Sequence, residues 1–127
     1  MDVEWQLREA GPASAERTVL LLPGGMCSAG SYAEVVAQPA LARTRLVAAT
    51  LPGQAGAAAV DVYRVEDHAR HVAELASKIG ADVVVGFSMG AVVTVEMVAA
   101  GGFSGPVVLL GVSLSPKDEP AFFGSTD

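Results

Sequence analysis

Apolar residues along this chain follow two patterns that alternate. Four continuous runs rich in β-branched residues, each followed by glycine or proline, are typical of strands buried on both faces. These runs are RTVLLLPGG, RLVAATLPG, ADVVVGFS and GPVVLLGVSLSP. The last of them predicts a strand over 107–114. A fifth stretch, Val3 to Leu7, instead alternates apolar and polar residues, which predicts a half-exposed first strand.

Helical patterns fill the segments between these runs. The clearest spans 65–79, where one stripe is apolar and Gly80 follows as a stop signal. Segment 89–100 is apolar nearly all round, so we expect it to be buried against a sheet. Segment 31–43 predicts a third helix, weakened near its end by Pro39. This alternation predicts an α/β fold: one domain over residues 1–127, with a mostly parallel sheet flanked by helices on both faces.

Composition narrows the class of protein. The chain has 127 residues, 51% of them hydrophobic, and a formal net charge of -6. Without a cluster of Lys and Arg, we expect no nucleic-acid partner and no anionic membrane surface. Cys27 is the single cysteine, which excludes an intrachain disulfide and favours a reducing compartment. The acidic start lacks a signal-peptide pattern, and no apolar stretch reaches membrane-spanning length. We therefore expect a cytoplasmic protein.

The candidate chemistry lies in the pentapeptide Gly86-Phe87-Ser88-Met89-Gly90. A strand that ends and a helix that begins within a few residues force Ser88 into a strained backbone conformation, with positive φ. Gly86 and Gly90 leave room for neighbouring backbone to approach. The serine hydroxyl then lies near the N-terminus of the helix, whose free N–H groups favour negative charge. The alternative is a tight turn that merely needs small residues.

This pentapeptide, in its strand–turn–helix context, resembles the nucleophile elbow of the α/β-hydrolase family. LLLPGG resembles the family's oxyanion loop, and Tyr32 falls at an aromatic position of that pattern. The resemblance implies that Ser88 is the nucleophile and that the N–H groups of Gly25 and Met89 hold the oxyanion, with Met26 as the alternative to Gly25. It implies neither a metal nor a cofactor. Met26 and Tyr32 line the substrate pocket or, equally, serve packing.

A further stretch, TLPGQAG, resembles a degraded form of the family's Asp-x-x-Gly-x-Gly loop. Thr50 takes the position of the acid, and Gln54 takes that of the usual histidine. This loop structures the site more often than it takes part in the chemistry.

The family's remaining catalytic residues, an acid and then a histidine, follow the serine in sequence. Here no histidine follows Ser88, because His68 and His71 both precede it on the 65–79 segment. We expect these two to be surface or interface residues. Asp118 or Glu119 can take the place of the acid, or they are solvated tail residues. Cys27 has no histidine partner nearby, so we interpret it as a small buried or half-buried residue.

Two hypotheses follow. The first is a serine hydrolase, similar to carboxylesterases or thioesterases, that acts on a small-molecule ester or thioester. The chain is then an N-terminal half, truncated after the strand that follows the elbow helix, and the catalytic base is absent from it. A serine rather than an aspartate at position 88 argues against dehalogenases and epoxide hydrolases. The second is a non-catalytic module that forms a homo-oligomer, or pairs with a complementing chain, through the edge strand 107–114.

Overall fold

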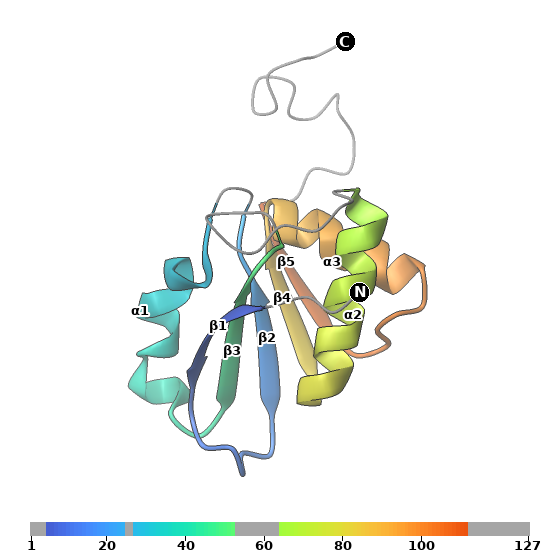
Figure 1. Ribbon diagram of the computed structural model, residues 1–127. Helices are drawn as coiled ribbons and strands as arrows, with labels where there is room; N and C mark the ends of the chain where they lie inside the picture. Colours follow the sequence, from blue (N-terminus) through green and yellow to red (C-terminus); the bar gives the residue numbers. More distant parts are fainter. Residues whose placement is uncertain (1–4, 25–26, 53–63, 112–127) are drawn as a thin grey trace.

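The computed structural model describes residues 5–24, 27–52 and 64–111 (Figure 1). Its strands are β1 Gln6–Ala10, β2 Thr18–Leu22, β3 Arg45–Thr50, β4 Val83–Phe87 and β5 Val107–Leu110. Its α-helices are α1 Ala33–Val36, α2 Val65–Ile79 and α3 Met89–Ala99, and 3-10 helices at Ala29–Tyr32 (η1) and Pro39–Leu41 (η2) flank α1. Strands and helices thus alternate from β2 onward, as the sequence pattern predicts.

The strands form one mixed sheet in the order β1-β3-β2-β4-β5. Strand β2 pairs in parallel with β3 and β4, and β4 pairs in parallel with β5. The mostly parallel sheet is therefore confirmed, and β1, antiparallel to β3, is its exception. Strand β1 lies later than predicted, at 6–10 rather than 3–7. Gly11, which follows the last residue of β1, has a positive φ of 86°.

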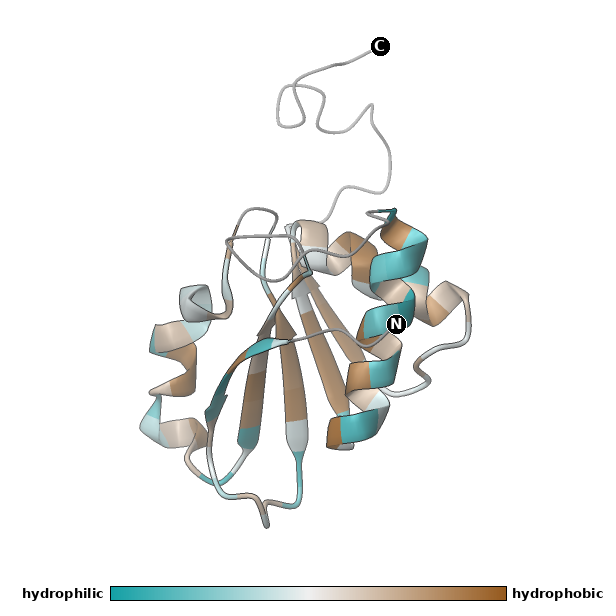
Figure 2. Ribbon diagram, viewed as in Figure 1, coloured by the Kyte–Doolittle hydropathy of each residue, from teal (hydrophilic) through white to brown (hydrophobic). Residues whose placement is uncertain are grey.

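Helices cover both faces of the sheet, as expected (Figure 1). Side chains alternate between the two faces along each strand. On one face the strands pack against α2 and α3, in a cluster that includes Leu20, Leu22, Val47, Val84, Val72, Leu75, Val93 and Met97. On the other face they pack beneath η1, α1 and η2, in a smaller cluster that includes Leu21, Leu46, Ala48, Ala29, Tyr32 and Leu41. The central strands are mostly apolar, with polar residues at the starts of β2 and β3, as Figure 2 shows.

Helix α2 begins and ends where the sequence predicts, with Gly80 as its left-handed C-cap. Helix α2 packs against α3 as well as against the sheet. Its buried side is wider than the predicted stripe, and it includes His68 and His71. The expectation that these histidines lie at a surface or interface is therefore wrong.

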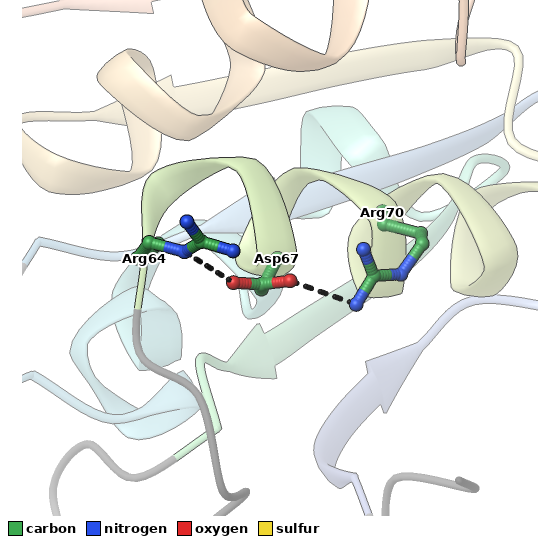
Figure 3. Close-up of polar contacts among 3 residues, drawn as sticks. All are labelled: Arg64, Asp67 and Arg70. Carbon is green, nitrogen blue, oxygen red and sulfur yellow. Dashed lines mark hydrogen bonds and ion pairs between the residues drawn. The ribbon is translucent and has the colours of Figure 1, made fainter.

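The polar start of α2 carries a compact ion-pair cluster (Figure 3). The buried Asp67 carboxylate accepts hydrogen bonds from Arg70 at 2.8 Å and from Arg64 at 3.3 Å. Burial acts to raise the pKa of Asp67, but the two guanidinium groups outweigh it, so this pKa lies below its ordinary value. A negative charge in the first turn also interacts favourably with the helix dipole.

The predicted helix over 31–43 is wrong in its length. The structure has only short helical turns there: η1, α1 and η2. Pro39 lacks an N–H group and restricts the residue before it to extended backbone. Gln38 accordingly has φ −70° and ψ 125°, which separates α1 from η2.

Strand β5 lies at one end of the described sheet. It covers 107–110 of the predicted 107–114, and residues 112–114 lie outside the described ranges. Within those ranges, no helix covers β4 and β5 on the face that carries α1, and Phe87, Val108 and Leu110 stay about half exposed there.

Every helix in the described ranges falls short of the length and apolar content that a bilayer crossing requires.

Candidate active site

Ser88 joins the end of β4 to the start of α3 in a strained backbone conformation. Its φ is 54° and its ψ is −112°, and among the described residues it is the only non-glycine residue with positive φ. Such a conformation costs on the order of 1–3 kcal/mol. Hydrogen bonds on both sides maintain it, since Ser88 N–H donates to the Leu110 carbonyl at 2.9 Å and the Ser88 carbonyl accepts from Ala91 at 3.0 Å. The predicted positive φ is confirmed.

The two flanking glycines are needed for space. A Cβ at Gly86 would lie 2.5 Å from the Gly90 carbonyl oxygen, and a Cβ at Gly90 would lie 2.5 Å from the carbonyl oxygen of Leu22. Gly86 therefore lets α3 approach β4, and Gly90 lets α3 approach the end of β2. Together they bring the start of α3 against the carboxyl ends of two neighbouring strands, and Ser88 lies at this junction.

The segment after β2 lies beside the serine. A Cβ at Gly24 would lie 3.5 Å from the Cβ of Ser88. Gly25 and Met26 follow directly and lie outside the described residues, so their predicted roles stay predictions. Met89 is the first residue of α3, and N–H groups in the first turn of a helix have no partner within it. The predicted role of the Met89 N–H as an oxyanion donor stays a prediction.

Two hydrogen bonds hold the chain that follows this loop. The Tyr32 hydroxyl donates to the Leu22 carbonyl at 2.7 Å, and the Ala29 N–H donates to the Thr50 hydroxyl at 2.7 Å. Burial raises the pKa of Tyr32 to about 12, so the phenol stays protonated as a donor. Thr50, which the sequence analysis places at the acid position of a loop that structures the site, is thus a structural anchor. Its specific partner, the Ala29 N–H, was not predicted.

Comparison with known proteins identifies the family to which this chain belongs. A family model described as "Alpha/beta hydrolase family" matches residues 19–126, which is most of the chain. The chain belongs to the alpha/beta hydrolase family. A search of curated proteins finds no match.

Solved structures share the fold of this chain. The N-acyl homoserine lactonase AidH, complexed with N-butanoyl homoserine, has a TM-score of 0.76 at 22% identity, over 93% of this chain and 44% of its own. Epoxide hydrolase A from Mycobacterium thermoresistibile has a TM-score of 0.73 at 24% identity, over 94% and 40%. A hypothetical protein from Pseudomonas aeruginosa PAO1 has a TM-score of 0.71 at 25% identity, over 97% and 46%. The chain spans less than half the length of each.

Among the described residues, neither histidine is hydrogen-bonded to Ser88. His68 is 1% exposed, and both of its ring nitrogens are buried without a hydrogen-bond partner. His71 is 9% exposed, and its Nδ1 is likewise unpartnered. Among the described residues, therefore, neither imidazole forms a hydrogen bond with the serine hydroxyl. Asp118 and Glu119, the candidate acids, lie outside those residues.

Burial lowers the pKa of His68 below its ordinary 6.5, and His71 acts in the same direction, against a weaker opposite effect of Asp67. The unfolded chain therefore takes up a proton near pH 6.5 that the folded chain does not. We expect the free energy of unfolding to fall as the pH drops below about 6.5, by at most about 1.4 kcal/mol per pH unit. Urea unfolding between pH 7 and pH 5 measures this slope.

His68→Leu should flatten this slope while keeping the stability at pH 7, because the substitution removes no hydrogen bond. Ser77→Ala, on the exposed side of the same helix, is the matched control and should keep the wild-type slope. The contribution of Asp67 is separable, since it is present above the ordinary pKa of 3.8 and is lost only below it. An unchanged slope in His68→Leu would contradict the assignment.

An apolar groove opens beside the elbow. It has a volume of about 250 Å³, and it is lined by Pro23, Gly24, Cys27, Ser31, Tyr32, Val35, Phe87 and Leu110. Cys27 is half-buried and unpaired there, which confirms its interpretation as a half-buried residue. Tyr32 both packs on the core and lines this groove.

In the described ranges, no group of three or more His, Cys, Asp or Glu side chains is placed to hold a metal ion.

Proposed function

We propose that Ser88 is the nucleophile of a serine hydrolase that acts on a small-molecule ester or thioester. The observation that carries the proposal is the positive φ of a serine between β4 and α3. This conformation persists at a cost in stability, and strained backbone of this kind clusters at active sites. A serine that merely completed a turn would gain nothing from it.

The chemistry follows from the positions of the groups. The Ser88 hydroxyl attacks the substrate carbonyl, and the negative charge that develops on the carbonyl oxygen is stabilised by backbone N–H groups. Met89 supplies one N–H from the start of α3, and we assign the second to Gly25. The tetrahedral intermediate then breaks its bond to the leaving alcohol or thiol to give an acyl-serine, and water hydrolyses the acyl-serine to the free acid. Both steps need a base: it passes the serine proton to the leaving group in the first step and a proton of the water back to Ser88 in the second.

We propose that this base, and the acid that orients it, come from residues outside these 127. His68 and His71 are buried, and neither forms a hydrogen bond with Ser88. The solved structures of similar fold have more than twice the length of this chain, which leaves room for such residues elsewhere in a longer or two-chain protein. We also propose a cytoplasmic location, in keeping with the unpaired Cys27.

Imidazole in solution can test this proposal, because it can replace a missing histidine. We expect the chain alone to react slowly with a fluorophosphonate probe at Ser88. A triad enzyme that has lost its catalytic side chains still accelerates the reaction over water, but only by about 10³–10⁴-fold. Added imidazole should raise the labelling rate in proportion to its concentration. Mass spectrometry locates the label and measures the rate.

Ser88→Ala is the control and should show no labelling at this peptide with or without imidazole. Rapid stoichiometric labelling without imidazole would contradict the absence of a base. Labelling that imidazole does not accelerate, or that falls on another residue, would contradict the role of Ser88.

A second candidate function is a non-catalytic module that associates through β5. The observation that favours it is the edge position of this strand, which has β4 on one side and no strand on the other among the described residues. Unpaired N–H and C=O groups along an edge favour pairing with another chain. We expect a concentration-dependent dimer in sedimentation velocity at micromolar concentrations, with amide-exchange protection along 107–110 that increases with concentration. A monomer with full protection at all concentrations would contradict this candidate.

A further inference from the structure

The α1 side of the sheet leaves an apolar area uncovered. The register Phe87↔Leu110 and Val85↔Val108 places these four side chains on one face. Phe87 is 48% exposed, Val108 46% and Leu110 47%. Val35, which is 40% exposed, borders this area from α1. The area continues into the groove beside Ser88, because Val35, Phe87 and Leu110 also line that groove.

This combined surface calls for an apolar occupant. Parallel strands are normally covered on both faces, and the opposite face of β4 and β5 is packed against α3. The exposed side chains Phe87, Val108, Leu110 and Val35 are apolar, and the two hydroxyls that line the groove, those of Ser31 and Tyr32, already donate to backbone carbonyls, so most of this surface offers an occupant apolar contact. Aromatic rings suit a groove that already contains Tyr32 and Phe87, since aromatic pairs add attraction to area burial.

One segment of the chain itself has the required chemistry. Residues 112–127 follow directly in sequence on Leu110 and Gly111, which lie at the edge of the uncovered area. Their charged stretch Lys117-Asp118-Glu119 is followed by Ala121-Phe122-Phe123. The residues between Leu110 and Phe122 span up to roughly 40 Å when extended. This length exceeds what a return to the groove requires.

We propose that this C-terminal segment docks on its own chain, with Phe122 and Phe123 in the groove between α1 and the β4–β5 face. Lys117, Asp118 and Glu119 then stay in water at the rim. Docking removes Phe87 and Leu110 from solvent. The contact does not require Ser88 to be a nucleophile.

The position of Cys27 permits a direct test. Cys27 is the only cysteine of the chain and lies in the groove wall, so a second cysteine at Ala121→Cys reports its approach without removing either phenylalanine. Under mild oxidation at low micromolar concentration, we expect an intramolecular disulfide between positions 27 and 121, detected as a monomer by non-reducing electrophoresis and peptide mass spectrometry. Its rate should not depend on protein concentration.

The matched control adds Phe122→Ser and Phe123→Ser to Ala121→Cys. Loop length and thiol stay the same, so the entropy of closing the loop is unchanged. We expect disulfide formation to slow at least about tenfold, as the effective concentration of the docked thiol is lost. Equal rates in the two variants would overturn the proposal. A disulfide-linked dimer whose rate rises with concentration would also overturn it and would assign the groove to the segment of a second copy.

The fluorescence of a dye that binds apolar surface tests docking without depending on thiol reactivity. Phe122→Ser with Phe123→Ser, in the otherwise unchanged chain, should raise the fluorescence of a dye that binds exposed apolar surface severalfold, while the far-ultraviolet circular dichroism stays unchanged. The substitutions replace apolar by polar side chains, so an increase can come only from surface that they uncover. Unchanged dye fluorescence would contradict docking.

Discussion

Gly90→Ala is expected to destabilise the protein by about 2–3 kcal/mol, the upper part of the range for overpacking. The added Cβ would lie 2.5 Å from the Leu22 carbonyl oxygen and 2.7 Å from that of Pro23. Backbone atoms cannot move aside as the end of a side chain can. The direction of the effect is diagnostic, because alanine in place of glycine within a helix normally stabilises it by about 1 kcal/mol. Urea unfolding measures the difference.

Gly30→Ala is the control for this substitution. A Cβ there would approach only the Ser28 hydroxyl, at 3.2 Å, on the exposed surface of η1. We expect a change within about 0.5 kcal/mol, as for most surface positions. If Gly90→Ala were as mild as Gly30→Ala, the close approach of α3 to the end of β2 would be wrong.

Ser88→Gly should abolish imidazole-accelerated labelling and, at the same time, raise the stability of the chain. Glycine adopts positive φ without the steric cost that a Cβ imposes, so relief of the strain at Ser88 should gain about 1 kcal/mol. Part of the gross relief is offset by the greater freedom of glycine in the unfolded chain. Chemical denaturation and probe labelling of the same preparations measure the two effects.

Ser88→Ala separates these effects. Alanine removes the hydroxyl but keeps the Cβ, so labelling should be lost while the free energy of unfolding stays near that of the wild type. If Ser88→Gly were no more stable than Ser88→Ala, the backbone at this position would not be strained, and the main support for an active-site serine would be removed.

The sequence predicted best those features that local patterns determine. Helix α2 was predictable to the residue because its apolar stripe ends at Gly80, which adopts a left-handed cap. The elbow was predictable because a serine between Gly86 and Gly90, placed between a strand and a helix pattern, leaves the backbone few alternatives. The positive φ of Ser88 follows from that constraint alone.

Features that depend on tertiary packing were not predictable from local patterns. His68 and His71 are buried although they lie outside the apolar stripe of α2, and the stripe alone does not show how far the neighbouring elements extend around the helix. The role of Thr50 depends on Ala29, which lies far from it in sequence and meets it only in the folded chain. Segment 31–43 has a helical composition, but Pro39 and the path over β1 and β3 break it into short turns.

The central position of β2 affects how the protein is built during synthesis. Residues 18–22 emerge from the ribosome early, yet β2 pairs with β4 at Val19↔Val83 through Leu22↔Gly86. Until residues 83–90 have emerged, one edge of a strand made of valine and leucine has no partner. Long-range pairing of this kind slows folding and exposes the nascent chain to aggregation. The pairing of β2 with β4 can form only after residues 83–90 have left the ribosome. The turn that carries Ser88 is therefore part of the segment whose synthesis determines when the centre of the sheet can assemble.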